Sequence, residues 1–167
     1  MQARPVSIPN AQIIDFVSQA ISRRYSTDDT SINLWAFVSM AVFSAPFPTP
    51  DDAIKAVHAA IEQQAVIARL CSVWEEQGKR SFTVGMGINT GKVFMGNLGA
   101  SSRMNYTVIG DNVNVVARLS NVAKEGIIIC ETTVEEVRNL VRTVEMDPVS
   151  VKGKSEPLRV YKVAALQ

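Results

Sequence analysis

The chain has 167 residues, enough for one domain that buries an ordinary apolar core without a disulfide or a structural metal. Its 17 Lys and Arg residues nearly balance 16 Asp and Glu residues, so no net field directs it to nucleic acid or to an anionic membrane. No apolar run is long enough to cross a bilayer, and the N-terminal residues lack the hydrophobic region of a signal peptide. We therefore expect residues 1–167 to form a single cytoplasmic domain without a membrane span.

The first quarter of the chain predicts a helix, a loop and a strand. Asn10 to Arg24 places apolar residues at helical spacing and ends in two arginines, where cations favour the helix dipole, so we expect a short amphipathic helix. The polar stretch 25–31 predicts a loop. Leu34 to Phe43 is almost uniformly apolar, which is typical of a strand buried on both faces.

A long helix is predicted next. Thr49 suits an N-cap, Pro50 the first helical position, and two acids fill the first turn. The helix should run to about Gln77, where Gly78 supplies a stop, giving a length of about 40 Å. Its core-facing stripe is formed by Ile54, Val57, Ile61, Ala65 and Ala68. We expect this Ala-rich side to pack on a sheet, and His58 to lie at the surface or its boundary.

The middle of the chain is rich in glycine. Phe82 to Ile88 and Lys92 to Gly96 predict two strands joined by a tight turn at residues 89–91, since Gly91 permits a positive φ. Tyr106 to Ile109 predicts a further strand.

A helix is predicted directly after that strand. Gly110 should end the strand, and Asp111 can cap a helix that runs to about Ala123. Asn114 and Arg118 are four residues apart and should therefore project from one face of this helix.

The C-terminal part predicts a short buried strand, Ile127 to Cys130, and a helix to about Leu140 with Thr132 and Glu135 as a capping box. Two more strands are expected over Val141 to Val151 and Leu158 to Ala164. Strands joined by short turns alternate with helices, which indicates the α+β class, a mixed sheet with helices on one face. Cys71 and Cys130 lie in apolar segments without metal-ligand spacing, which is typical of buried, reduced thiols.

Three ordered motifs carry a family resemblance: GMGINTGKVFMGNLG, NYTVIGDNVNVVARL and VKGKSEPLRVY. They resemble the catalytic domain of class III nucleotidyl cyclases, especially bacterial adenylate cyclases. The resemblance covers about residues 32–163, whereas residues 1–31 diverge. It implies a ferredoxin-like sheet and a head-to-tail homodimer or heterodimer with active sites at the interface.

The implied reaction is attack of the ribose 3′-hydroxyl of ATP on its own α-phosphate, with loss of pyrophosphate. Arg118 matches the family's transition-state arginine, whose planar, permanently charged fork suits a phosphate, and Asn114 matches the asparagine that orients the ribose. Thr107 stands where the family reads the purine, and threonine there goes with adenine. Lys152 matches the lysine that contacts the terminal phosphates. Without the motif, Asn114 and Arg118 would be read as a solvated helix face and Thr107 as an ordinary strand residue.

The resemblance also implies two Mg²⁺ or Mn²⁺ ions held by two aspartates, and here the sequence departs from the pattern. Aligned from residues 40–43, the second aspartate falls on Phe37, its preceding glycine on Ala36 and the adenine-reading lysine on Asn33. Phenylalanine cannot bind a hard cation, which takes oxygen ligands. We find no apolar strand bearing an aspartate between residues 1 and 13, so no metal ligand is assigned. The nearby acids are Asp15, Asp28 and Asp29.

Three interpretations stay open. The chain is an adenylate cyclase with a lost or altered N-terminal part, or a non-catalytic module that binds nucleotide or a partner and regulates. Alternatively, it is one half of a heterodimeric cyclase whose metal-binding aspartates come from another chain.

Overall fold

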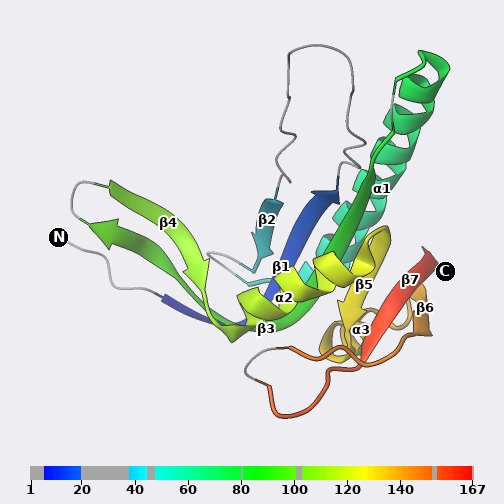
Figure 1. The fold of residues 1–167 in the computed structure, drawn as a ribbon. Coiled ribbons are helices and arrows are strands. Elements are labelled where there is room, and N and C mark those ends of the chain that lie inside the picture. The colour runs from blue at the N-terminus through cyan, green and yellow to red at the C-terminus, as the bar shows by residue number, and fades with distance from the viewer. Residues whose placement is uncertain are drawn as a thin grey trace.

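The computed structural model describes residues 6–19, 38–44, 48–79, 81–100, 103–151 and 154–166. The strands are β1 (Val6–Gln19), β2 (Val38–Phe43), β3 (Thr83–Ala100), β4 (Arg103–Ile109), β5 (Gly126–Cys130), β6 (Val141–Glu145) and β7 (Val160–Leu166). The helices are α1 (Asp52–Glu76), α2 (Asp111–Ala123) and α3 (Glu131–Val137). The strands form one 7-stranded sheet in the order β2-β1-β3-β5-β7-β6, with β4 paired to β3 (Figure 1).

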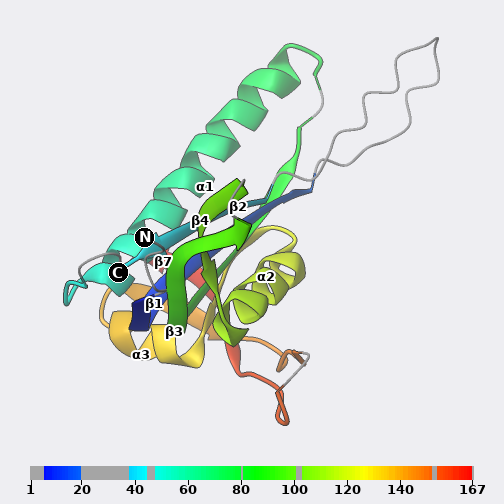
Figure 2. The same cartoon turned by 90° about the vertical axis from the view of Figure 1, so that its left-hand side faces the viewer.

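The sheet is mixed, because β3 and β5 run parallel whereas the other described neighbours are antiparallel. This confirms the α+β class and the mixed sheet. The helices, however, cover both faces rather than one, and Figure 2 shows α1 and α2 on opposite sides of the strands. Alternation along β3 explains the two layers, since successive side chains of a strand point to opposite faces. Met86 and Ile88 pack with Val57 of α1, whereas Gly87 lies against α2.

The predicted N-terminal helix is wrong over its described part. Residues 6–19 form β1, which lies inside the sheet between β2 and β3. The spacing of Ile13 and Val17 fits one face of a helix, but the segment is rich in β-branched residues and has a strand partner on each side. The expected lack of an apolar strand near the start of the chain is therefore wrong, because β1 spans residues 6–19 and carries Asp15. The predicted helical residues 20–24 and the predicted loop lie outside the described residues.

The strand predicted over Leu34 to Phe43 is described from Val38 as β2, and it ends at Phe43 as expected. It lies at the edge of the sheet, and Met40 is 39% exposed, so the prediction of burial on both faces is wrong. A uniformly apolar run does not by itself distinguish a central strand from an edge strand.

The long helix is confirmed as α1. It ends at Glu76, and Gly78 has a φ of 70° at the stop. Of the predicted stripe, Val57 is buried and Ile54 and Ile61 are half-buried against the sheet. Ala53, Ala56 and Ala60, which the predicted stripe did not include, are buried beside them. In its second half the predicted stripe residues Ala65 and Ala68 are exposed instead.

The far half of α1 contacts the start of β3 through a few specific bonds. The Gln64 side chain donates to the Val84 carbonyl at 2.7 Å, and the Cys71 thiol donates to the Phe82 carbonyl at 3.2 Å. Cys130 is buried as predicted, but Cys71 is only half-buried, so the prediction of its burial is wrong; both are free cysteines. His58 is exposed, as expected.

The start of α1 differs in detail from the predicted N-cap. Asp51 is the cap residue, and the Asp52 carboxylate accepts hydrogen bonds from the backbone N–H and the hydroxyl of Thr49, at 2.7 and 2.5 Å. Burial alone would raise the pKa of Asp52, but the hydrogen bonds from Thr49 and Ser44 and the charge of Lys55 outweigh it. They hold the pKa below its usual 3.8.

Asp52→Ala should lower the free energy of unfolding at neutral pH by about 1 kcal/mol, a typical value for a lost helix-start acceptor. Because the folded pKa lies below the unfolded one, the stabilisation by Asp52 is present above pH 3.8 and is lost as the pH falls through the folded pKa. Urea unfolding at pH 7 and at pH 3 should therefore give a smaller difference between wild type and variant at pH 3. A difference independent of pH would contradict this account of the carboxylate.

The predicted hairpin at residues 89–91 is also wrong, because β3 runs without a turn from Thr83 to Ala100. Thr90 pairs with Gln12 of β1 in the middle of the strand. The glycines with positive φ among the described residues are Gly78, Gly110 and Gly126. β4 then turns back along the second half of β3, and this β3–β4 ribbon (residues 94–100 and 103–109) reaches away from the helices (Figure 1).

The C-terminal elements are confirmed with different bounds. β5 is buried as predicted, but α3 begins at Glu131 after the N-cap Cys130 and ends at Val137. Thr132 therefore lies inside α3, and its hydroxyl donates to the Thr90 carbonyl at 3.2 Å instead of capping the helix. β6 ends at Glu145, and only an isolated bridge joins Val149 to Leu158 in the described part beyond it.

Candidate functional site

Helix α2 lies unusually close to β3. A Cβ atom added at Gly87 would lie 2.6 Å from the Val116 carbonyl oxygen and 2.7 Å from the Ser120 backbone nitrogen. At Gly85 it would lie 2.5 Å from the Ser120 carbonyl oxygen. The glycines of the first motif therefore allow the helix backbone to approach the strand, a role different from the turn that the sequence predicted.

Buried apolar side chains complete this contact. Val115, Val116 and Leu119 of α2 are at most 2% exposed. Leu119 packs with Ile128 of β5, and Val116 packs with Val93 and Val108 of the strands β3 and β4. The sheet therefore fixes one side of α2 along most of its length.

The opposite side of α2 carries the predicted catalytic residues. The helix runs from Asp111 to Ala123 as expected, although Gly110, with a φ of 147°, is the N-cap in place of Asp111. Asn114 and Arg118 are both exposed, and their four-residue spacing places them on one face. This face can present a guanidinium and a carboxamide to a ligand outside the subunit.

Thr107 lies on β4, where it pairs with Gly96 of β3 and is half-buried. The neighbouring Val108 points to the side that packs with Val116 of α2. Because successive strand residues point to opposite faces, Thr107 lies on the outer face of the β3–β4 ribbon. Ile109 is on the same face and is 46% exposed. The structure therefore places Thr107 on β4 and the Asn114–Arg118 pair on α2, the two elements that Gly110 joins.

The remaining predicted positions are only partly described. Lys152, Asn33, Phe37 and the acids Asp28 and Asp29 lie outside the described residues. Asp15 is on β1, in register with Met40 of β2 and Gly87 of β3. Within the part of the chain that the structure describes, no group of three or more His, Cys, Asp or Glu residues could hold a metal ion.

Two asparagines that the sequence analysis did not select also belong to this region. Asn89 is 4% exposed, and its amide nitrogen donates to the Asn112 side-chain oxygen at 3.0 Å. The Asn112 amide in turn donates to the Lys92 carbonyl at 2.9 Å. A polar residue within the apolar strand pattern of β3 was the available signal, but its partner is 23 residues further along the chain.

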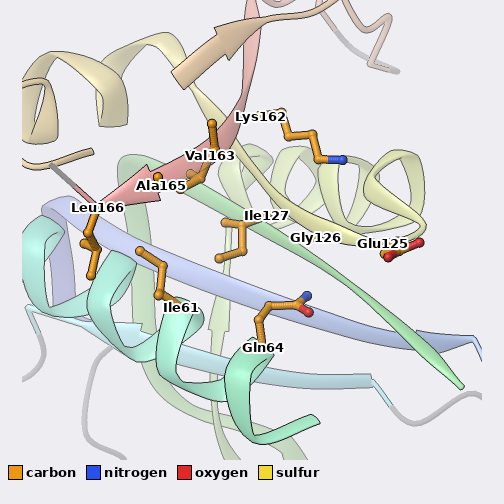
Figure 3. A pocket seen from close by; sticks show the side chains of 10 residues that line it. Ile61, Gln64, Glu125, Gly126, Ile127, Lys162, Val163, Ala165 and Leu166 are labelled. Carbon is orange, nitrogen blue, oxygen red and sulfur yellow. The ribbon is translucent and has the colours of Figure 1, made fainter. Parts of the chain in front are cut away.

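A surface cleft of about 250 Å³ lies elsewhere, between α1, the start of β5 and the end of β7 (Figure 3). The pairing of β5 with β7 explains why the cleft is open. The β5–β7 ladder ends at Ile128 and Lys162, so the next residues, Ile127 and Val163, line the opening. None of the predicted site residues that the structure describes lines this cleft.

In the described part of the chain, no helix has the length and apolarity that a membrane span requires.

Comparison with known proteins identifies the family. Residues 38–164 match the adenylate and guanylate cyclase catalytic domain. An adenylate cyclase of Anabaena cylindrica is 37% identical over 124 residues, which cover 66% of this chain and 24% of that protein. The terminal-differentiation specific adenylate cyclase of Dictyostelium discoideum is 34% identical over 165 residues, covering 90% of this chain and 7% of that protein. The chain thus spans a quarter or less of the length of these relatives.

The fold comparison agrees. The adenylyl cyclase CyaB from P. aeruginosa superposes with a TM-score of 0.80 and 24% identity, covering 96% of each chain. At that identity the similarity shows the fold, while the sequence match of residues 38–164 shows the family. This chain belongs to the adenylate and guanylate cyclase catalytic domain family.

Proposed function

We propose that the chain, as one domain over residues 1–167, converts ATP to cyclic AMP and pyrophosphate together with a second cyclase domain. It contributes to a shared site the side chains of Thr107, Asn114, Arg118 and Lys152. The observation that carries the proposal is the exposed Asn114–Arg118 face of α2, which projects outward from a helix packed closely on β3. A face of this kind needs a second subunit to enclose a nucleotide. A heterodimer in the cytoplasm with a cyclase domain that keeps the metal-binding aspartates, acting in intracellular signalling, provides that subunit.

The proposed roles follow from the chemistry of the side chains. As the 3′-oxygen attacks the α-phosphorus and the bond to the pyrophosphate oxygen breaks, negative charge grows on the phosphate oxygens. Arg118 stabilises this charge with its fixed guanidinium, and Asn114 orients the ribose by hydrogen bonds. The Thr107 hydroxyl reads the adenine edge, and Lys152 holds the leaving phosphates.

The metal ions of the family are the part of the reaction that this chain does not fit. A divalent ion would activate the 3′-hydroxyl and neutralise the phosphates. Phe37 occupies one aspartate position in the alignment and has no oxygen ligand. We therefore assign the metal-binding carboxylates to the partner domain and no step to metal held by this chain.

A complementation assay tests this proposal. The purified chain with ATP and Mn²⁺ should form cyclic AMP at or near background. Adding a cyclase domain that keeps both metal aspartates but carries a disabled Asn-Arg pair should restore activity. Strong activity of the chain alone, retained when Asp28 and Asp29 are both changed to Ala, would show that the N-terminal alignment is wrong; loss of that activity in Asp15→Asn would then assign a metal role to β1.

A second candidate function is a non-catalytic, nucleotide-binding regulatory module. It is favoured by Phe37, which stands at the position of one metal-binding aspartate in the alignment and has no oxygen ligand. Nucleotide binding without any restored activity in the mixed dimer would support this function over the first.

The adenine assignment predicts a selectivity that one substitution changes. ATP analogues should compete for binding better than GTP analogues, and Thr107→Cys should narrow the difference because it removes the hydroxyl from the purine reader. Competition with a fluorescent nucleotide measures both affinities. Thr143→Cys on β6, also half-buried, is the matched control and should leave selectivity unchanged. Equal affinities of the wild-type chain for the two nucleotides would remove the basis of the adenine assignment.

A further inference from the structure

The hydrogen bonds of Asn89 and Asn112 form a directional link between β3 and α2. The Asn89 amide donates to Asn112 Oδ1 at 3.0 Å, and Asn112 Nδ2 donates to the Lys92 carbonyl at 2.9 Å. Asn89 is almost fully buried, so its amide has no access to water as an alternative partner. The link therefore joins the second residue of α2 to two points on the strand.

Close packing against Gly91 also restricts the Asn112 side chain. A Cβ atom at Gly91 would lie 2.4 Å from Cγ and Nδ2 of Asn112, so the carboxamide fits only because residue 91 lacks a side chain. A shift of α2 by a single residue would move Asn112 by about 1.5 Å along the helix axis and break both hydrogen bonds. We call Asn89, Gly91 and Asn112 the asparagine clamp.

The clamp and the apolar contacts of α2 do different things. Burial of Val115, Val116 and Leu119 stabilises the helix on the sheet, but the hydrophobic effect is non-directional and tolerates small displacements. The hydrogen bonds of the clamp have narrow limits of distance and angle. The clamp is therefore the part of the contact that sets the position of α2 along β3.

We propose that Asn89 and Asn112 are positioning residues that place Arg118 for catalysis. Arg118 lies on the same rigid helix, about 9 Å along the axis from Asn112. A displacement of the helix carries its guanidinium by a similar amount. This inference rests on the proposed function, because it assigns to Arg118 the role in the transition state described above.

The test compares Asn89→Ala/Asn112→Ala with Asn121→Ala in the mixed dimer. The double variant removes both partners of the Asn89–Asn112 bond, so no buried amide is left facing a missing partner. Asn121 is the matched control, because it is an exposed asparagine on α2 whose amide donates to the Ala117 carbonyl of the same helix at 2.7 Å.

We expect the double variant to lower kcat by about 10- to 100-fold, since displacements of about 1 Å have effects of this size, with KM changed less than about 3-fold. Asn121→Ala should leave both constants unchanged. In an Arg118→Ala background the double variant should cause no further loss, because there is no guanidinium left to position. Additive losses would show that the asparagines act independently of Arg118 and would overturn the inference.

Hydrogen exchange gives a readout that does not depend on turnover. The backbone amides of residues 115–117 should exchange faster in the double variant than in Asn121→Ala, with the global unfolding transition retained. Single Asn112→Ala should have a lower Tm than the double variant, because it removes the Asn112 Oδ1 acceptor and leaves the buried Asn89 amide with only the backbone carbonyl of residue 112, at 3.5 Å, as a partner.

The two proposals fail in different ways. The clamp would be overturned, whatever the activity, by two results together. Residues 115–117 would exchange at the same rate in the double variant as in Asn121→Ala, and the Tm of Asn112→Ala would not lie below that of the double variant. Failure of the wild-type chain to restore activity would overturn the proposed function, and the exchange data would still decide whether the clamp positions α2.

Discussion

Arg118→Ala is expected to lower the kcat of the cyclase activity that this chain restores in the mixed dimer by about 100- to 1000-fold. Loss of one preorganised donor at a developing oxyanion costs about 100- to 1000-fold in kcat, and Arg118 is the donor assigned to this chain. The side chain is exposed in the isolated subunit, so the free energy of unfolding should change by less than about 0.5 kcal/mol. A large kinetic effect without a stability effect is the expected signature of a group that acts on a ligand.

Two control variants sharpen this measurement. Arg118→Lys keeps the charge but not the planar fork of donors, so it should recover only part of the lost rate. Arg142→Ala on β6 removes another exposed arginine and should leave kcat unchanged. If the Arg118→Ala variant restored cyclase activity in the mixed dimer at the wild-type rate, the proposed role of the α2 face would be contradicted. The main support for the proposed function would then be lost.

The sequence predicted best those elements whose bounds depend on local signals. Gly78 marks the end of α1 because a positive φ follows the last helical turn, and the breaker Gly110 separates β4 from α2. The spacing of Asn114 and Arg118 predicted that they share one helix face, and both are exposed. Such signals act between neighbouring residues, so no knowledge of the tertiary structure is needed to read them.

The errors lie where distant segments decide the conformation. Residues 6–19 could satisfy a helical pattern, but pairing with β2 and β3 makes them a strand. The Asn-Thr-Gly sequence at residues 89–91 is typical of a turn, yet here it runs straight because β1 pairs along it and Asn112 bonds to Asn89. The partner in each case is too far along the chain for a local pattern to reveal.

The candidate site shows the same division. The family motifs selected Asn114 and Arg118, the exposed residues of α2 that match the motif. They did not select the buried Asn89, whose proposed role depends on its hydrogen bond from β3 to Asn112 of α2. The face occupied by Thr107 likewise follows from the packing of Val108 against Val116. Residues proposed to touch a ligand are thus easier to select from sequence than residues proposed to position them.

Gly87→Ala is expected to give the largest loss of stability among the substitutions considered. The new methyl group would lie 2.6 Å from the Val116 carbonyl oxygen, 2.7 Å from the Ser120 nitrogen and 2.8 Å from the Leu119 Cβ. Two of these are backbone atoms of α2, so no rotation of a side chain relieves the clash. The helix must move away from β3, at a cost of about 3 kcal/mol or more in the free energy of unfolding.

Thermal and urea unfolding measure this cost, and Gly78→Ala is the matched control. A Cβ atom at Gly78 meets nothing within 4 Å, so that variant is disfavoured only by the φ of 70°, by roughly 1 kcal/mol. The difference between the two variants isolates the steric contact of α2 with β3 from the backbone preference of glycine. If Gly87→Ala were no less stable than Gly78→Ala, α2 would not approach β3 as closely as the structure has it. The same displacement moves the outer face of α2, so Gly87→Ala should also lower kcat in the mixed dimer, whereas Gly78→Ala, far from that helix in the chain, should not.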